Sequence, residues 1–339
     1  MIDWPQRRHR FEDATMTHPP VPLGTFPTPV EPAPRLAAAL GLGPEDLWVK
    51  RDDLTGLGAG GNKIRKLEWT VGAALAEGAD TLVTTGAPQS NHARLTAAAG
   101  ARLGLDVVLV LRGTPGASRS GNLALDGLFG ARLAWAGEVD QAGLDTAAAE
   151  VCARLRADGA RPALIPFGGS STLGARGYVR CGTELREQLP DLRTAVVALG
   201  SGGTMAGLVA ALGSGSVLGV DVGALADPAA AVVEFAAPLT AEEVTPDALR
   251  ILRDQVGAGY AALTAPVRDA LRLAARSEGL VLDPVYTGRA LAGLHAAVRD
   301  GTVRPGERTV FLHTGGLPGL FGHPDTIAFA EEGTRVFGA

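Results

Sequence analysis

The chain has 339 residues, of which 46% are hydrophobic and 20% are charged, and its formal net charge is −5 at pH 7. This length exceeds what a single hydrophobic core usually fills, so we expect two domains. The acidic balance excludes the basic surface that a nucleic-acid partner would need, while small anionic ligands remain compatible with it.

The few cysteines and the polar N-terminus argue against secretion, and the glycines in the longest uncharged segment argue against a membrane span. Cys152 and Cys181 are too few for a disulfide framework and lack metal-ligand spacing, so a reducing, cytoplasmic compartment and no metal site are expected. Residues 1–20 are polar and predict an extended N-terminal segment rather than a signal peptide. Residues 194–220 carry no charge, but glycines interrupt them, which predicts a strand, glycine loop, helix and strand of a buried core.

Short β-branched runs alternate along the chain with segments of helical length that are rich in alanine and leucine. The expected strands are 47–50, 81–84, 107–111, 163–166, 195–199, 217–220 and 310–312. The expected helices include 63–77, 92–103, 144–158, 174–188 and 265–277. This alternation predicts an α/β fold with parallel sheets flanked by helices, in which ligands bind beyond the carboxyl ends of the strands.

Lysine is scarce, and one of the three lysines lies in a glycine-rich segment. Lys50, Lys63 and Lys66 are the only lysines among 31 cationic residues, and Lys63 directly follows Gly60-Gly61-Asn62. Lysine can lose its proton and form a Schiff base with a carbonyl, whereas arginine stays charged. Lys63 is therefore a candidate nucleophile. The alternative is a plain helix start, although a lysine there opposes the helix dipole.

Three polar or glycine-rich segments follow expected strands, where a ligand site of an α/β fold lies, and the last of them is residues 313–319. Residues 89–92, Gln-Ser-Asn-His, open a helix whose free N–H groups suit a carboxylate or phenolate oxygen. The alternative is a plain N-cap by Ser90 or Asn91. Residues 200–207 form a glycine and hydroxyl loop that can cradle a phosphate. Because Asp221 follows about 20 residues later, the loop also leaves a dinucleotide-dependent oxidoreductase open.

The three tyrosines are Tyr178, Tyr260 and Tyr286, and the last lies beside the turn Asp283-Pro284. A phenol at such a position is a candidate acid or base, and a packed tyrosine is the alternative. Pyridoxal 5′-phosphate would use all of these parts, because it needs a lysine, a phosphate cradle and partners for its phenolic oxygen and its pyridine nitrogen.

Five motifs occur in order between about residues 21 and 322: KRDDLTG leading into GGNKIRKLE, QSNH, GSGGTMAGL, LDPVYTGRALAGL and HTGGLPGLF. With them the chain resembles the D-cysteine desulfhydrase and 1-aminocyclopropane-1-carboxylate deaminase family. These are fold type II pyridoxal-phosphate enzymes related to the tryptophan synthase β subunit. The resemblance implies a homodimer and a small amino-acid substrate. It also implies a large domain of residues 1–65 and 173–339, with a smaller α/β domain of residues 66–172 inserted in it.

The resemblance assigns roles to the matching positions of this chain. The implied cofactor-binding residues are Lys63, Asn91, Ser201, Gly202, Gly203, Thr204, Thr287 and Thr314. Lys63 would form the Schiff base, Asn91 would face the phenolic oxygen of the cofactor, and Thr287 would face its pyridine nitrogen. The implied substrate-binding residues are Gln89, Ser90, Asn91 and Tyr286, and the implied catalytic residues are Lys63, Tyr286, Tyr260 and Ser90.

Two threonines favour the desulfhydrase branch of this family. The cyclopropane deaminases have glutamate where this chain has Thr287, and typically leucine where it has Thr314. A carboxylate would keep the pyridine nitrogen protonated and make the strong electron sink that opening a cyclopropane demands. A hydroxyl gives a weaker sink, adequate for expelling a good β leaving group. We therefore expect α,β-elimination, with D-cysteine as the leading substrate and pyruvate, ammonia and hydrogen sulfide as products.

Departures from the family pattern keep other substrates open. Pro88 removes a backbone donor beside the expected carboxylate site, and Leu95 replaces a common glutamine. Arg176 stands where an apolar residue is usual, and would either recognise a second anionic group on the substrate or be a surface or interface charge. The alternatives are therefore a cyclopropane deaminase, a lyase for an anionic β-substituted alanine such as cysteate, the oxidoreductase, and a non-catalytic amino-acid binder.

Overall fold

The computed structural model describes residues 18–116 and 120–334, so the expected extended segment of residues 1–20 lies almost entirely outside the described residues. The chain forms two β-sheets. The six-stranded sheet has the order β1 (Val30–Pro32), β2 (Leu47–Lys50), β10 (Thr309–Leu312), β7 (Thr194–Leu199), β8 (Val217–Asp221) and β9 (Arg250–Leu252). Within it only the pair of β1 and β2 is antiparallel.

The four-stranded sheet is parallel throughout and has the order β5 (Arg132–Trp135), β4 (Asp106–Leu111), β3 (Thr81–Gly86) and β6 (Pro162–Ile165). Helices α2 (Lys63–Ala76) and α3 (Asn91–Leu103) pack on one face through the cluster that contains Leu82 and Leu109. Helix α5 (Gln141–Ala157) packs on the other face against Val83 and Val108. Both faces are therefore covered, and the inner strands β3 and β4 are buried at every position except Asp106.

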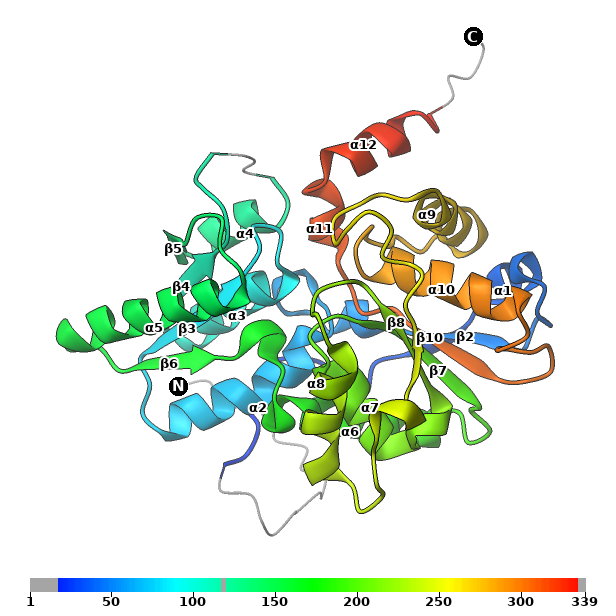
Figure 1. Ribbon diagram of the computed structural model, residues 1–339, viewed down its shortest axis with the longest axis horizontal. Helices are drawn as coiled ribbons and strands as arrows, with labels where there is room; N and C mark the ends of the chain where they lie inside the picture. Colours follow the sequence, from blue (N-terminus) through cyan, green and yellow to red (C-terminus); the bar gives the residue numbers. More distant parts are fainter. Residues whose placement is uncertain (1–17, 117–119, 335–339) are drawn as a thin grey trace.

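Helices also cover both faces of the six-stranded sheet (Figure 1). Helices α1 (Pro34–Leu40), α9 (Ala265–Glu278) and α10 (Thr287–Arg299) pack on the face that carries Val196. Helices α6 (Thr172–Gln188), α7 (Gly203–Leu212) and α8 (Pro228–Ala236) pack on the face that carries Val197. Adjacent residues of one strand thus enter opposite cores, as the two-residue period of a strand requires.

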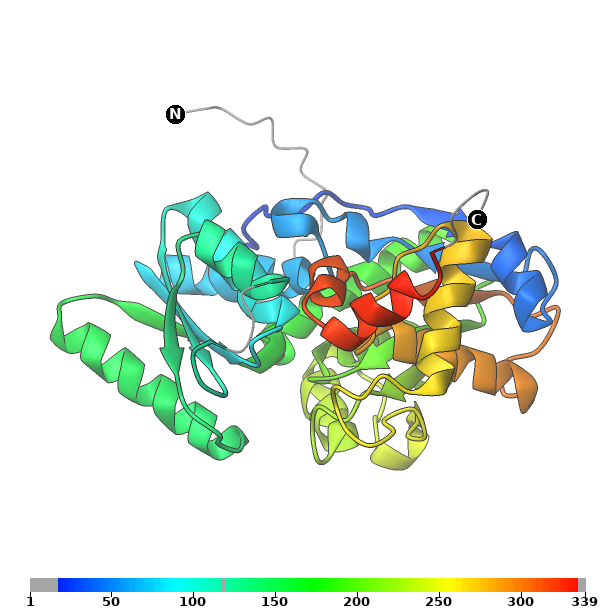
Figure 2. The ribbon, with the colours of Figure 1, turned by 90° about the horizontal axis from the view of Figure 1, so that it is seen from above.

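Figure 2 shows the two sheets with their helices side by side. The remaining helices are α4 (Asn122–Leu128), which packs beside α3, and α11 (Leu317–Phe321) and α12 (Pro324–Glu331), which follow β10. The strands of the smaller sheet lie between residues 81 and 165, and the strands of the larger sheet come from both flanking parts of the chain. The division at residues 65/66 and 172/173 stays a proposal.

The α/β class and the seven expected strands are confirmed, as are the five expected helices. Three strands were missed, namely β1, β5 and β9. All three are edge strands of three or four residues with no fully buried position, so they lack the continuous apolar run that marked the others. Residues 194–220 form β7, α7 and β8, and no helix in the described part of the chain has the length and apolarity to cross a membrane.

Candidate active site

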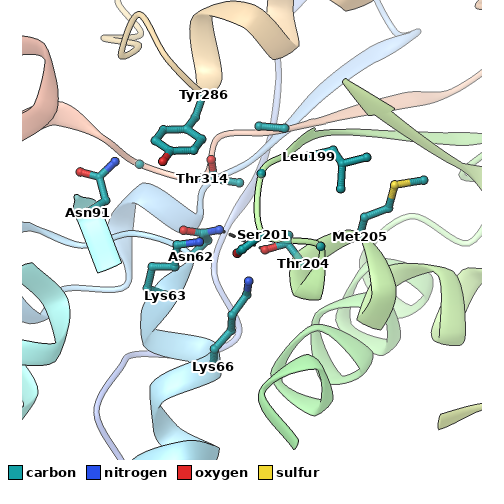
Figure 3. A pocket seen from close by; sticks show the side chains of 14 residues that line it. Asn62, Lys63, Lys66, Asn91, Leu199, Ser201, Thr204, Met205, Tyr286 and Thr314 are labelled. Carbon is teal, nitrogen blue, oxygen red and sulfur yellow. Dashed lines mark hydrogen bonds between the residues drawn. The ribbon is translucent and has the colours of Figure 1, made fainter. Parts of the chain in front are cut away.

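A cavity lies where the start of α2, the start of α3 and the loop after β7 meet, with contributions from Tyr286 and from the segment after β10 (Figure 3). These segments follow or flank the carboxyl ends of strands in both sheets, which is the expected place for a ligand in an α/β fold. The side chains that line the cavity include those of Asn62, Lys63, Lys66, Asn91, Ser201, Thr204, Tyr286 and Thr314.

The glycines before Lys63 fix the start of α2 against the end of β10. Gly60 and Gly61 have φ values of 69° and 128°, and a Cβ on Gly60 would overlap the carbonyl oxygen of Asp53. Only glycine adopts such a conformation readily. The amide of Gly61 donates to Thr55 Oγ1 at 2.8 Å, and the amide of Asn62 donates to the carbonyl of Thr314 at 3.0 Å. Lys63 is thereby held at the first position of the helix, on the cavity wall.

The three lysines lie in different environments, which indicate different roles. Lys50 is buried and pairs with Glu184 at 2.8 Å, so it belongs to the structural core. Within the described residues, no carboxylate pairs with the amine of Lys63 or Lys66. Burial lowers the pKa of Lys63 from 10.5 to about 8, which makes an appreciable fraction of neutral amine available near neutral pH. This is the property that a Schiff-base lysine requires.

A buried polar network holds α2 in position behind Lys63. Arg65 donates to Asp52 at 2.9 Å and to Glu184 at 2.8 Å. Burial acts to raise the pKa of Asp52, but Arg65, the Tyr178 hydroxyl and Lys50 together outweigh it and keep the pKa below its usual value. Charges buried in this way must be paired to be tolerated. The network therefore fixes the helix that carries Lys63 against α6.

Lys66 is a site residue that the sequence reasoning missed. Its buried amine donates to Ser170 Oγ at 2.9 Å, and that hydroxyl lies 2.7 Å from Ser201 Oγ. Burial, followed by the charge of Lys63, places the pKa of Lys66 well below its usual value. The spacing of three residues from Lys63 was the available signal, because side chains three apart share a helix face.

The loop after β7 forms a phosphate-sized cradle of donors. Gly202 has a φ of 88°, and α7 begins at Gly203, so the first N–H groups of the helix lack intrahelical partners. Thr204 Oγ1 accepts a hydrogen bond from Asn62 at 3.1 Å. A Cβ on Gly168 would overlap Ser201 Oγ and would lie 3.6 Å from Lys63 Nζ, so the opposite wall also requires glycine. Figure 3 shows the Lys66 amine directed toward Ser201 and Thr204.

These features fit pyridoxal 5′-phosphate. Two amines without a carboxylate partner complement a phosphate, and the helix start adds N–H donors and the positive end of its dipole. Lys63 would hold the aldehyde carbon of the cofactor. Lys66, Ser201, Gly202, Gly203 and Thr204 would hold its phosphate.

Replacing Lys66 by methionine is expected to weaken binding of pyridoxal 5′-phosphate by about 10- to 100-fold, because a charge-assisted hydrogen bond contributes about 1.5–3 kcal/mol. The measurement is a titration of the apoprotein followed by absorbance. Pyridoxal, which lacks the phosphate, is the matched ligand and should bind the variant and the wild type equally. An equal loss for both ligands would show that Lys66 does not contact the phosphate.

The start of α3 presents Ser90 and Asn91 to the cavity region. Ser90 Oγ caps the helix by accepting from the amide of Ala93 at 3.1 Å, so its capping role is confirmed. Asn91 lines the cavity of Lys63, and its Oδ1 accepts from Asn122 at 3.0 Å. Gln89 instead accepts from the amide of Asn122 at 2.9 Å and lies outside that cavity. The side chain of Gln89 therefore positions the segment at Asn122, and its predicted substrate contact stays a proposal.

Tyr260 and Tyr286, for which the resemblance implies catalytic roles, lie beside each other, and their hydroxyl groups share a hydrogen bond. Their rings meet edge to face, with centroids 6.0 Å apart. Both rings line a second lobe of the cavity that also contains Lys63 and Ser90. Burial raises the pKa of Tyr260 to about 12 and the pKa of Tyr286 well above its usual value, so both phenols are neutral at physiological pH. A neutral phenol can donate a proton at this position.

The structure departs from the sequence expectation at Thr287. Its hydroxyl is fully buried, donates to Asp283 Oδ1 at 2.7 Å and accepts from the amide of Asp283 at 2.8 Å. Thr287 does not line the cavity of Lys63, whereas Thr314 does. The reason is that Thr287 begins α10, where the Asp283 carboxylate satisfies the first N–H groups. Of the two threonines, Thr314 is thus the one whose side chain could meet the pyridine nitrogen of a cofactor bound at Lys63.

The unusual residues Arg176, Leu95 and Pro88 lie away from the cavity of Lys63. The Arg176 guanidinium lies 5.9 Å from the centre of the Trp69 ring, which fits the structural interpretation of this charge. Leu95 is fully buried in the core around α3. Pro88 lines a neighbouring hollow together with Gln89 and Asn91.

Asp221, the residue that kept a dinucleotide site open, is engaged by its own segment. Its Oδ1 accepts from the amide of Gly223 at 2.8 Å, and its Oδ2 lies 3.7 Å from Arg253. A dinucleotide site would also leave Lys63 without a role.

Known proteins resemble this chain over most of its length. A family profile described as "Pyridoxal-phosphate dependent enzyme" matches residues 21–315. A Pyrococcus furiosus protein named "Putative 1-aminocyclopropane-1-carboxylate deaminase" is 40% identical over 320 residues, which cover 91% of this chain and 95% of that protein. A Pyrococcus abyssi protein of the same name is 42% identical over 326 residues, covering 92% and 96%.

Solved structures agree with these matches. A crystal structure of an ACC deaminase homologue superimposes with a TM-score of 0.84 at 38% identity, covering 92% of this chain and 97% of the other. Threonine deaminase isoform 2 from Solanum lycopersicum superimposes with a TM-score of 0.61 at 18% identity, covering 90% and 84%, and so shares the fold. The comparisons decide against the oxidoreductase alternative.

Proposed function

The chain belongs to the pyridoxal-phosphate dependent enzymes, in the group of 1-aminocyclopropane-1-carboxylate deaminase and D-cysteine desulfhydrase, and from this membership we propose that it catalyses α,β-elimination of a β-substituted alanine. D-Cysteine is the leading substrate, and its products would be pyruvate, ammonia and hydrogen sulfide. We further propose a cytoplasmic homodimer, as the family resemblance implies.

The observation that carries this proposal is the chemical character of the cavity lining. Among the described residues, no aspartate or glutamate lines the cavity that contains Lys63, and Thr314 supplies a hydroxyl there. A hydroxyl can bond a neutral pyridine nitrogen, whereas a carboxylate would keep that nitrogen protonated. The cavity therefore supports the weaker electron sink, which suffices for a good leaving group on the β carbon.

Pyridoxal 5′-phosphate, when bound, supplies an electron sink for negative charge that develops at the substrate α carbon. The residues of the chain supply binding and proton transfer. The N–H groups and the Ser90 hydroxyl at the start of α3 bind the substrate carboxylate, which the positive end of the helix dipole also favours. The Lys63 amine, with its pKa of about 8, acts as the base for the α proton.

Tyr286 assists proton transfer at the β side of the substrate. Its hydroxyl is bonded to that of Tyr260, and both rings line the lobe next to Lys63. Because both phenols stay neutral, Tyr286 can donate a proton to a leaving group and recover it through Tyr260.

The relatives named as cyclopropane deaminases support a second candidate, which is the conversion of 1-aminocyclopropane-1-carboxylate to 2-oxobutanoate and ammonia. That substrate lacks an α proton, and opening its ring needs a strong electron sink. Thr314 and the absence of carboxylates among the described lining residues argue for elimination over ring opening.

We expect kcat/KM for β-chloro-D-alanine or D-cysteine to exceed that for 1-aminocyclopropane-1-carboxylate by at least about 100-fold, which corresponds to about 2.7 kcal/mol of transition-state stabilisation. Pyruvate and 2-oxobutanoate are measured separately by chromatography. The L-enantiomers serve as the control for chirality. Equal or faster turnover of the cyclopropane acid would assign the chain to the deaminase branch.

A further inference from the structure

A single arginine in the second lobe of the cavity lacks a partner. Arg112 follows β4 and lines this lobe together with Lys63, Ser90, Tyr260 and Tyr286. Its backbone is fixed on both sides, because its amide donates to the carbonyl of Gly86 at 3.0 Å and the next residue bridges to Gly137. The backbone at Arg112 is therefore anchored to the end of the smaller sheet.

The Arg112 guanidinium makes no hydrogen bond or ion pair with any described residue, and its Nε is buried without a partner. The other arginines that face the interior are all engaged. Arg65 binds two carboxylates, and Arg289, although its Nε also lacks a partner, donates through its terminal nitrogens to the carbonyls of Val222, Gly259 and Ala262. A guanidinium that is partly removed from water without a partner loses hydration that a ligand can restore. Arg112 thus stands out as a group prepared for an anion.

The charge of the residues that line this lobe also favours an anionic ligand. The lining includes Lys63 and Arg112, and none of its described residues is a carboxylate. Lys63 is assigned to the cofactor, and the start of α3 supplies N–H groups and the Ser90 hydroxyl for the substrate carboxylate. The positive charge of Arg112 then has no counterpart on a substrate whose β substituent is neutral.

The neighbours of Arg112 place this charge on the β side of the substrate. Tyr260 and Tyr286 line the same lobe, and the Arg112 charge reaches Tyr260, where burial raises the pKa of the phenol and the guanidinium opposes that rise. Leu144 and Phe167 close the lobe with apolar surface, and Gln141 adds one amide. An oxyanion held there would face a cation and a neutral proton donor.

We propose that Arg112 extends the activity of this site to substrates whose β substituent is an oxyanion, and that the class it fits is a β-sulfonated alanine. This rests on the proposed elimination and adds a second substrate class beside D-cysteine. A guanidinium can donate two parallel hydrogen bonds to a pair of oxygens in one group. Two oxygens of a singly charged sulfonate can accept them. The role that the sequence offered to Arg176 is thereby transferred to Arg112.

The proposed elimination of sulfite consumes only the substrate and water. The α carbon loses a proton to the Lys63 amine, and the bond between the β carbon and sulfur breaks with both electrons leaving on sulfite. The released aminoacrylate takes up water and yields pyruvate and ammonium. No oxidation or reduction of an external group is required.

The first test measures binding and does not depend on turnover. The holoenzyme is titrated by calorimetry with 3-sulfopropanoate and with butanoate, which share a carboxylate and differ in the second charge. We expect 3-sulfopropanoate to bind at least about 10-fold more tightly, and Arg112→Gln to remove this preference by weakening only the sulfonate ligand, by about 10- to 100-fold. Arg112→Lys should keep part of the preference.

The second test measures kcat/KM for cysteate and for β-chloroalanine, each as both enantiomers. Arg112→Gln should lower the value for cysteate by about 10- to 100-fold and change that for β-chloroalanine by less than about threefold. Arg176→Gln is the matched control, because it removes an arginine outside the cavity and should leave both ratios unchanged. Thermal unfolding of each variant verifies that it folds.

Several outcomes would overturn the proposal. An equal loss for both ligands in Arg112→Gln and Arg112→Lys would mean that Arg112 holds the common carboxylate or shapes the cavity. Unchanged selectivity in the variants, or no preference in the wild type, would also exclude it. Failure of every β-substituted alanine to react would refute the proposed elimination instead, and the binding preference would still decide the role of Arg112.

Discussion

Replacement of Lys63 by alanine should abolish turnover and the visible absorbance of the holoenzyme. The variant loses both the covalent link to the cofactor and the base for the α proton, and the base alone is typically worth about 10²- to 10⁴-fold. In the wild type, borohydride reduction followed by peptide mass mapping should place the cofactor on Lys63. A label on Lys50 or Lys66 would contradict the assignment.

The pH dependence of cofactor uptake gives a second measure of Lys63. Burial lowers the pKa of its amine to about 8, so the amine is mostly charged below this pH and mostly neutral above it. Only the neutral amine attacks a carbonyl, and the rate at which the apoprotein becomes yellow should therefore rise with pH through about 8. A rate that stays flat up to pH 9.5 would show that the amine keeps an ordinary pKa. Lys50→Arg is a control that leaves the Lys63 amine in place.

Tyr286→Phe is expected to lower kcat by about 10²- to 10⁴-fold while the absorbance of the bound cofactor is retained. The phenol of Tyr286 lines both lobes of the cavity and is bonded to Tyr260, so its loss removes the proton donor without removing the ring that packs there. The measurement is steady-state pyruvate release together with the absorbance spectrum.

Tyr260→Phe serves as the comparison, because it removes the partner hydroxyl and leaves Tyr286 in place. We expect a smaller loss for this variant and a changed pH profile, since Tyr260 supports the neutral state of the pair. Wild-type rates in Tyr286→Phe would leave that residue with a packing role only. A larger loss in Tyr260→Phe than in Tyr286→Phe would exchange the two roles.

The sequence was sufficient for those features that depend on neighbouring residues. Strands such as β7 and β8 are buried on both faces, so their apolar runs identified them without knowledge of their partners. The short edge strands β1 and β5 escaped because pairing to one neighbour, and not their own composition, makes them strands. Lys63 was identifiable because lysine is scarce in the chain and this one follows Gly60-Gly61-Asn62.

Only the tertiary structure decided which side chains meet at the cavity. The resemblance assigned Thr287 to the pyridine nitrogen, but the Thr287 hydroxyl bonds the Asp283 carboxylate, and Thr314 is the threonine that lines the cavity. Lys66 meets Ser170 across 104 positions of the chain, and no local pattern encodes such a contact. The anion-binding role that the sequence offered to Arg176 falls, in our proposal, to Arg112, which no sequence pattern singled out. Whether a charge is paired depends on segments that are distant in sequence and adjacent in space, and folding alone brings these together.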